Sequence, residues 1–176
     1  MKKNLVLTVT GLLCLFISCK DSGATSMADV NQKNLDINAK IIKAIETGDA
    51  TTINSLIADD IVDHMGPNGK EIKGGENVRP MLIDMHKHMK DLKFEVITAS
   101  ANTDYVFTLS KISGTTIDTA MGMPAGTLMN ENVVDLVKIK EGKVTEHWGY
   151  VDPAAMMKQM KESHSMNQKK DSTIIK

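Results

Sequence analysis

The sequence predicts an α+β fold in which a curved antiparallel sheet wraps around N-terminal helices, with a short helix at the C-terminal end. Two observations predict this class. Apolar residues recur at helical spacing between residues 31 and 91. From residue 93 onward, segments rich in β-branched and aromatic residues alternate with turns. Helices followed by a run of strands are typical of α+β domains, and a curved sheet over a helical layer leaves a cone-shaped pocket.

The start of the chain resembles a bacterial lipoprotein signal peptide over residues 1–18. Lys2 and Lys3 precede a mostly apolar stretch, which ends in a small residue followed by Cys19. The pattern is similar to a lipobox, so we expect export to the bacterial cell envelope, cleavage before Cys19 and a membrane anchor through lipidation of its thiol. A secretory signal cut a few residues later is the alternative. Residues 19–30 are small and polar, and are expected to form a flexible tether.

Composition excludes several classes of protein. The chain has 176 residues, with 21 Lys and Arg against 22 Asp and Glu. This balance disfavours a nucleic-acid-binding protein, which normally carries a basic excess. Both cysteines lie within the first 19 residues, so the folded part has neither a disulfide framework nor a thiolate metal site. Beyond the leader, no apolar run is long enough to span a bilayer.

The helical part is predicted to contain three helices. Apolar residues at helical spacing indicate a helix over 31–47, which Gly48 can end. Asp49 can cap the second helix, which follows directly. After a turn-rich segment, a third helix is expected over about 76–91.

The second part is predicted to be a sheet. Glu141-Gly142 suits a two-residue hairpin loop between its last two strands. Asp152-Pro153 can then begin a short helix that ends near residue 162. One cone domain is therefore expected over 31–162, followed by a disordered tail over 163–176. The expected strands are 93–100, 105–113, 128–140 and 143–150.

Three stretches carry a resemblance to a known family. They are the Gly48-Asp49 step with 58–64, the Gly-Met-Pro-Ala-Gly loop at 122–126, and Gly-Lys-Val-Thr-Glu-His-Trp-Gly-Tyr-Val-Asp at 142–152. Together they resemble the SnoaL-like polyketide cyclases of the nuclear-transport-factor-2-like superfamily, which have a cystatin-like cone. The resemblance covers about 31–162.

The resemblance implies a small-molecule ligand, mostly apolar, in the mouth of the cone. In the cyclases, an aspartic acid acts as general acid and base on an activated C–H beside a carbonyl, without a metal or an organic cofactor. The family motif Gly-Thr-His corresponds to Gly114-Thr115-Thr116, and Thr116 cannot carry a proton near pH 7 as histidine does. Whether the chain is an enzyme is therefore left open. If it is, it resembles a polyketide cyclase or a ketosteroid isomerase. The alternative is a non-catalytic homodimeric lipoprotein for binding or scaffolding.

Strand alternation around the Glu141-Gly142 turn selects the candidate site residues. It places Asp135 opposite Trp148, on an inner face shared by Glu131, Glu146 and Tyr150. Asp135 is the preferred general base and Glu146 a second catalytic candidate, because apolar walls and a neighbouring acid raise a carboxyl pKa. Trp148, Glu131 and Tyr150 are expected to contact the ligand. Alternatively, the acids lie at the rim in structural roles. A register slip of one residue would exchange the faces and bring in His147 instead.

Two further residues complete the candidate site. His64 follows a short strand-like segment and is predicted to orient a carbonyl or relay a proton, with a half-exposed loop histidine as the alternative. Met123 lies in the loop expected at the mouth, where a thioether adapts to varied ligands. No metal site is predicted, because His86 and His88 lie on different sides of one helix.

Overall fold

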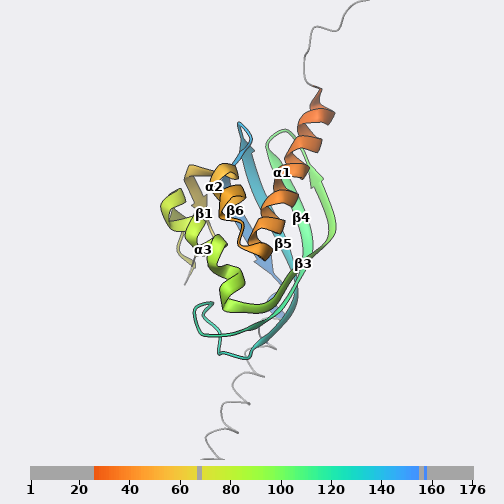
Figure 1. Cartoon of the computed structure of the whole chain (residues 1–176). Coiled ribbons are helices and arrows are strands. Elements are labelled where there is room, and N and C mark those ends of the chain that lie inside the picture. The colour runs from red at the N-terminus through yellow and green to blue at the C-terminus, as the bar shows by residue number, and fades with distance from the viewer. Residues whose placement is uncertain (1–25, 67–68, 155–156, 158–176) are drawn as a thin grey trace, which may run out of the picture.

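The computed structural model describes residues 26–66, 69–154 and 157 of the chain (Figure 1). The predicted signal peptide at 1–18, Cys19, most of the tether and the tail at 163–176 lie outside these residues. So does most of the predicted C-terminal helix. Within the described part, no helix is both long enough and apolar enough to cross a membrane.

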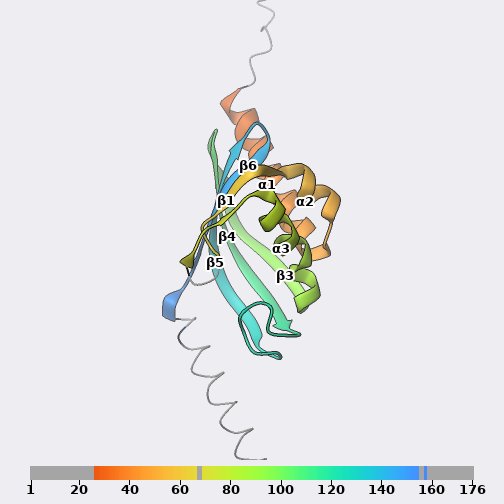
Figure 2. The same ribbon diagram turned by 90° about the vertical axis from the view of Figure 1, so that its left-hand side faces the viewer.

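The described residues form an α+β fold, as predicted. The sheet has six strands: β1 (Ile57–Asp63), β2 (Ile72–Lys73), β3 (Met89–Ala101), β4 (Tyr105–Thr116), β5 (Leu128–Lys140) and β6 (Lys143–Val151). Across the sheet they lie in the order β2-β1-β6-β5-β4-β3. Figure 2 shows that the three labelled helices lie on one side of this curved sheet, and none of them lies over its other side. We call the side that faces the helices the inner face, and the opposite side the outer face.

The helices are α1 (Met27–Thr47), α2 (Ala50–Leu56) and α3 (Gly75–His88). Helix α1 begins four residues earlier than predicted, because Ser26 and Asp29 form a capping box at the end of the expected tether. Gly48 ends it with φ 69°, a conformation that favours glycine. Asp49 caps α2 through the backbone N–H groups of Thr51 and Thr52, as predicted.

The strands extend the predicted ones and add two. Strand β1 pairs in parallel with β6 and antiparallel with β2, so residues far apart in the sequence lie side by side. The hairpin loop at Glu141 and Gly142 is present, and both residues have positive φ values, as a tight two-residue turn requires.

A β-bulge shifts the register of the last hairpin. Ile139 pairs with Val144 as predicted, but the next pair is Lys138 with Glu146, so Thr145 is an extra residue on β6. The predicted pairing of Asp135 with Trp148 is therefore wrong, and Asp135 pairs with Gly149. Because side chains alternate along a strand, every β6 residue beyond the bulge has changed face.

The apolar core lies between the helices and one end of the inner face. It joins side chains of α1, such as Ile37 and Ile41, to Val106 on β4 and Val137 on β5. Asn38 lies among these apolar residues and donates a hydrogen bond of 2.8 Å to Thr108. The core therefore gives way to polar side chains partway along β4 and β5, and this boundary positions the site.

Candidate functional site

Three ionisable side chains from three strands meet on the inner face. His147 on β6 lies between Asp63 on β1 and Asp135 on β5. Its Nδ1 is 3.2 Å from Asp63 Oδ2, and its Nε2 is 3.1 Å from Asp135 Oδ1. The Asp63 side chain is 3% exposed, whereas those of His147 and Asp135 are 24% and 26% exposed. The row therefore runs from a buried carboxylate to one that solvent reaches.

We call the side chains of Asp63, His147 and Asp135 the row. Within the row, the positive charge of His147 and the negative charges of the two aspartates stabilise one another. Burial alone would lower the pKa of His147, but hydrogen bonds and charges from Asp135 and Asp63 outweigh it and raise the pKa to about 9. Burial alone would raise the pKa of Asp63, but His147 and the backbone N–H of Met65 outweigh it and hold the pKa below its usual range. At neutral pH the row is therefore an imidazolium between carboxylates.

Met65 and Gly149 frame the site on the β1 side. The backbone N–H of Met65 donates a hydrogen bond of 2.8 Å to Asp63 Oδ1. Gly149 is the strand partner of Asp135, and a methyl group at its Cα would collide with the Met65 sulfur. Glycine at 149 thus lets the Met65 side chain lie against the sheet beside Asp135.

The predicted site residues divide between the two faces. Asp135 and Glu131 lie on the inner face, as expected from alternation on β5, and are separated by about 13 Å along the strand. The inner-face position expected for Glu146, Trp148 and Tyr150 is wrong, because the bulge at Thr145 turns them to the outer face. Their proposed contact with a ligand beside Asp135 has no geometric support, and Tyr150 is 58% exposed.

The outer face carries a second histidine cluster, centred on His64. Its ring stacks on Trp148 with a centroid separation of 4.5 Å and an interplanar angle of 6°. Its Nδ1 lies 3.0 Å from Glu71, and its Nε2 lies 3.5 Å from Glu146. Lys138 donates a hydrogen bond of 2.7 Å to Glu146, which holds the pKa of Glu146 below its usual range. His64 is thus separated by the sheet from Asp135.

Met123 lies in the loop between β4 and β5, beyond the end of the inner face. Thr116, which stands where the family histidine is expected, closes this loop. Its hydroxyl donates to the Pro124 carbonyl at 2.6 Å and accepts from the Thr127 N–H at 2.9 Å. Thr116 is 2% exposed, so its role in the described structure is to hold the loop. The loop starts about 20 Å along β5 from Asp135.

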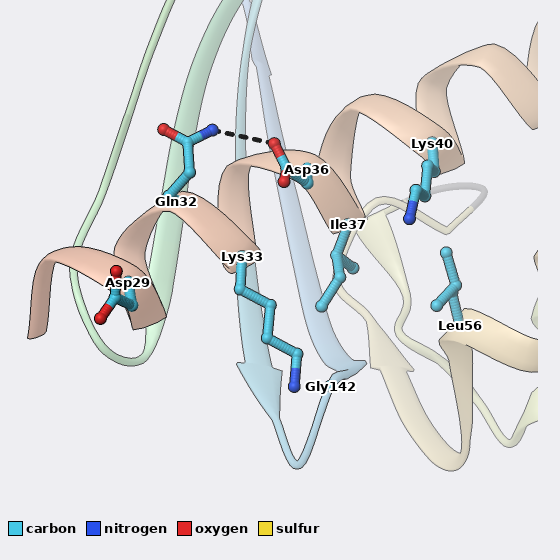
Figure 3. A pocket seen from close by; sticks show the side chains of 8 residues that line it. All are labelled: Asp29, Gln32, Lys33, Asp36, Ile37, Lys40, Leu56 and Gly142. Atoms are coloured by element: carbon cyan, nitrogen blue, oxygen red, sulfur yellow. Dashed lines mark hydrogen bonds between the residues drawn. The ribbon is translucent and has the colours of Figure 1, made fainter. Parts of the chain in front are cut away.

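An open groove of about 500 Å³ lies elsewhere, between α1, α2 and the tip of the β5–β6 hairpin. Figure 3 shows Lys33 extending from α1 toward Gly142, with Ile37 and Leu56 farther along the groove. On the same helix, Gln32 and Asp36 are joined by a hydrogen bond of 2.8 Å. The residues predicted for the site do not line this groove.

The arrangement has the properties of an acid–base site. Asp135 can accept a proton, while His147 is already protonated near neutral pH and holds the carboxylate in place. The residues described contain no group of three or more His, Cys, Asp or Glu placed to hold a metal ion.

The sequence did not indicate Asp63 as a site residue, and it indicated His147 only for the case in which the strand register slips by one residue. One feature of the sequence could have indicated Asp63. It lies two residues after the apolar Ile61 in a short strand-like segment, and residues two apart in a strand share a face. An acid on a buried face needs a partner. The partner itself could not be identified, because β1 pairs with a strand more than eighty residues later.

Comparisons with known proteins agree with this fold. A family model described as SnoaL-like polyketide cyclase matches residues 36–160. A search of curated proteins found no match.

Solved structures of the same fold include an LEH-like epoxide hydrolase from M. tuberculosis, at 16% identity and a TM-score of 0.61 over 77% of this chain and 94% of that one. A SnoaL-like polyketide cyclase from Agrobacterium tumefaciens has 16% identity and a TM-score of 0.59, over 72% of this chain and 96% of that one. A protein with a cystatin-like fold from Xanthomonas campestris has 27% identity and a TM-score of 0.56, over 73% of this chain and 94% of that one.

Proposed function

The chain belongs to the SnoaL-like polyketide cyclase family, and on this premise we propose that it binds a small, mostly apolar molecule with a carbonyl group and moves a proton at the carbon next to that carbonyl. The observation that supports this proposal is the placement of Asp135. Its carboxylate is 26% exposed on the inner face and is fixed by His147. His147 is itself fixed by the buried Asp63.

Each member of the row has a separate role in the proposed reaction. Asp135 is the general base: the C–H bond breaks, its proton passes to an Asp135 oxygen, and the electron pair moves onto the carbonyl to form an enolate. Asp135 then returns the proton to the same carbon or, where a carbon–carbon double bond is conjugated with the enolate, to the γ-carbon, and the electron pair returns to re-form the carbonyl. His147 is a positioning residue, because an imidazolium cannot accept the proton. Asp63 anchors His147 and balances its charge.

Hydrogen exchange at carbon tests this proposal directly. In D₂O, the wild-type protein should speed the loss of α-hydrogens from a panel of neutral bicyclic ketones such as 2-tetralone, followed by ¹H NMR. Asp135→Asn should lower the catalysed rate by roughly 10²–10⁴-fold, the usual contribution of a general base. Rates are compared well below the melting temperature of the variant, which should fall because His147 loses one of its two counter-charges.

The matched control is Glu146→Gln, since Glu146 is an acid on the outer face of the neighbouring strand. We expect it to leave the exchange rate unchanged. Equal rates in the wild-type protein and Asp135→Asn, or no catalysed exchange across the panel, would contradict the proposal.

We also propose that this domain acts in the bacterial cell envelope, anchored through Cys19. This part of the proposal depends on the sequence of the leader. Mass spectrometry of the chain expressed in a bacterial host should detect an acylated Cys19 at the new N-terminus. Cys19→Ser should release the protein from the membrane fraction. Recovery of the wild-type chain with an intact leader, or without acylation, would contradict the anchor.

A homodimeric binding or scaffolding protein is the second candidate, and the outer face favours it. Two rows of apolar side chains cross β4, β5 and β6 there, and three of these side chains are at least 40% exposed: Phe107, Val134 and Tyr150. Exposed apolar surface of this kind is typical of association sites. Sedimentation velocity should give a dimer that Val134→Glu converts to monomer. A wild-type monomer would contradict this candidate.

A further inference from the structure

The hydroxyl of Ser110 is a buried polar group without a partner. Ser110 lies on β4 with 0% exposure. Its Oγ makes no hydrogen bond with any of the residues that the structure describes. A buried hydroxyl without a partner destabilises a protein, so natural proteins contain few of them and each requires an explanation.

Thr108, two residues earlier on the same face, shows how this strand satisfies a buried hydroxyl. Thr108 is 1% exposed and accepts a hydrogen bond of 2.8 Å from Asn38 on α1. Ser110 is as deeply buried, and α1 supplies no such partner to it. The comparison shows that the fold provides a partner for one hydroxyl of the pair and leaves the other free to donate.

The strand register places the free hydroxyl beside the proposed base. Ser110 pairs with Val133, and Thr108 pairs with Asp135, so Ser110 and Asp135 are diagonal neighbours on the inner face. Diagonal neighbours in antiparallel strands are separated by about 7–8 Å at Cα and somewhat less at Cβ. A molecule that displaces the side chains covering Ser110 can therefore present one atom to the carboxylate and another to the hydroxyl.

We propose that Ser110 is a ligand-binding residue whose hydroxyl donates a hydrogen bond to the carbonyl oxygen of the molecule that Asp135 deprotonates. This inference rests on the proposed function. When the C–H bond breaks, negative charge develops on that oxygen, and a donor already in place stabilises it. The hydroxyl then has the partner that the free protein lacks.

The same placement selects a neutral ligand over an anionic one. On the inner face of β5, Glu131 and Asp135 lie on either side of Val133, the strand partner of Ser110. Glu131 has no ion pair within the described part of the chain, and the charge of His147 is shared between Asp63 and Asp135. A carboxylate or phosphate bound beside Ser110 would meet uncompensated negative charge, so a ketone or ester is the expected class.

Ser110 is out of reach of water, so a ligand reaches it only by displacing packed side chains. A ligand oxygen that accepts a hydrogen bond from Ser110 should therefore make binding tighter. The probes are 2-tetralone and tetralin, which share a ring system and differ in the carbonyl. The wild-type protein should bind the ketone more tightly, as measured by titration in ¹⁵N-edited NMR spectra.

Ser110→Ala should remove this preference, with about a tenfold loss in affinity for 2-tetralone and none for tetralin. The catalysed α-hydrogen exchange should fall by roughly 10- to 100-fold. The melting temperature should stay the same or rise, because the variant no longer buries an unpaired hydroxyl. Ser113→Ala, on the outer face of the same strand, is the matched control and should change none of the three.

The outcomes separate this inference from the proposed function. If Asp135→Asn abolishes exchange but Ser110→Ala retains both exchange and the preference for the ketone, the role of Ser110 is overturned while the proposed function stands. A melting temperature lowered by Ser110→Ala would also overturn it, since the hydroxyl would then have a structural partner. If the wild-type protein neither binds 2-tetralone nor exchanges its hydrogens, both proposals fall.

Discussion

Two histidines of this protein each lie between two carboxylates, His147 on β6 and His64 directly after β1, yet their surroundings differ. His147 is on the inner face, where Asp63 is 3% exposed and has its ionic contact with this imidazole. His64 is on the outer face, where Glu71 is 43% exposed and also pairs with Lys73. The same residue types thus form a buried row on one side of the sheet and a solvated cluster on the other.

The difference shows how burial decides the strength of a charge pair. In water, an ion pair is screened, and competing lysines divide its effect. Beside the core, His147 has few alternatives to Asp63 and Asp135, so its pKa is raised to about 9 although burial alone would lower it. The inner face therefore holds an imidazolium at neutral pH, and this cation fixes the carboxylate of Asp135.

Removal of one carboxylate from each histidine cluster should give the largest difference between the two faces in the free energy of unfolding. Asp63→Asn leaves the buried side of His147 without its counter-charge, and loss of one partner from a buried pair costs about 3 kcal/mol in the free energy of unfolding. Urea denaturation at pH 7 measures this loss. Glu71→Gln, the equivalent change beside His64, should give no resolvable change. Equal effects of the two substitutions would show that burial does not distinguish the clusters.

The pH dependence of stability should follow His147. Its folded pKa is raised from 6.5 to about 9, so the imidazolium contributes fully below pH 6.5, and its contribution is lost as the pH rises through about 9. The shift corresponds to about 3 kcal/mol. Urea denaturation between pH 6 and pH 9.5 should show this decline.

The control for the pH series is His147→Gln, which should remove most of the decline in this range. His64→Gln, on the outer face, should retain it. The titration of His147 itself can be followed by NMR of its imidazole ring. A midpoint near 6.5 would contradict the coupling of His147 to the two aspartates.

The two strands of the last hairpin show what could be predicted from the sequence. On β5, alternation placed Glu131 and Asp135 on the inner face correctly, because β5 pairs with β4 without interruption. On β6, the same reasoning failed beyond Thr145, where a bulge adds one residue. The bulged residue is not a glycine, so nothing in the local sequence marks it. One extra residue exchanged Glu146 and Trp148 for His147 on the inner face.

Long-range pairing was the other feature that sequence patterns could not supply. The helices and the four long strands carry local signals, such as the Asp49 cap and the Glu141-Gly142 turn, and were predicted with small errors at their ends. The parallel pairing of β1 with β6 depends on the whole fold, and it is this pairing that brings Asp63 to His147. The candidate base could thus be predicted, whereas the residues that hold it could not.

Adjacent threonines at the end of β4 extend the contrast between the faces. Thr116 is 2% exposed, and its hydroxyl makes two hydrogen bonds across the loop, to Pro124 and Thr127. Thr116→Val should lower the free energy of unfolding by about 2 kcal/mol, because it leaves the buried Thr127 N–H with a poorer partner. Thr115→Val, one residue earlier on the opposite face, should change it little. Equal losses would show that the loop does not depend on the Thr116 hydroxyl.

The smallest expected effect is the stacking of His64 on Trp148, which tests whether the outer cluster contributes more than solvated ion pairs do. The two rings are nearly parallel at 4.5 Å, and stacked ring pairs contribute about 0.5–1.5 kcal/mol beyond the area they bury. A double-mutant cycle with His64→Ala and Trp148→Ala, measured by urea denaturation, should give a coupling energy of about 0.5 kcal/mol, since both rings lie near solvent. The matched cycle pairs His64→Ala with Tyr150→Ala, whose exposed ring lies two residues farther along β6. It should give no coupling. A coupling as large as the loss from Asp63→Asn would contradict the contrast, because the outer face would then hold its histidine as firmly as the inner face does.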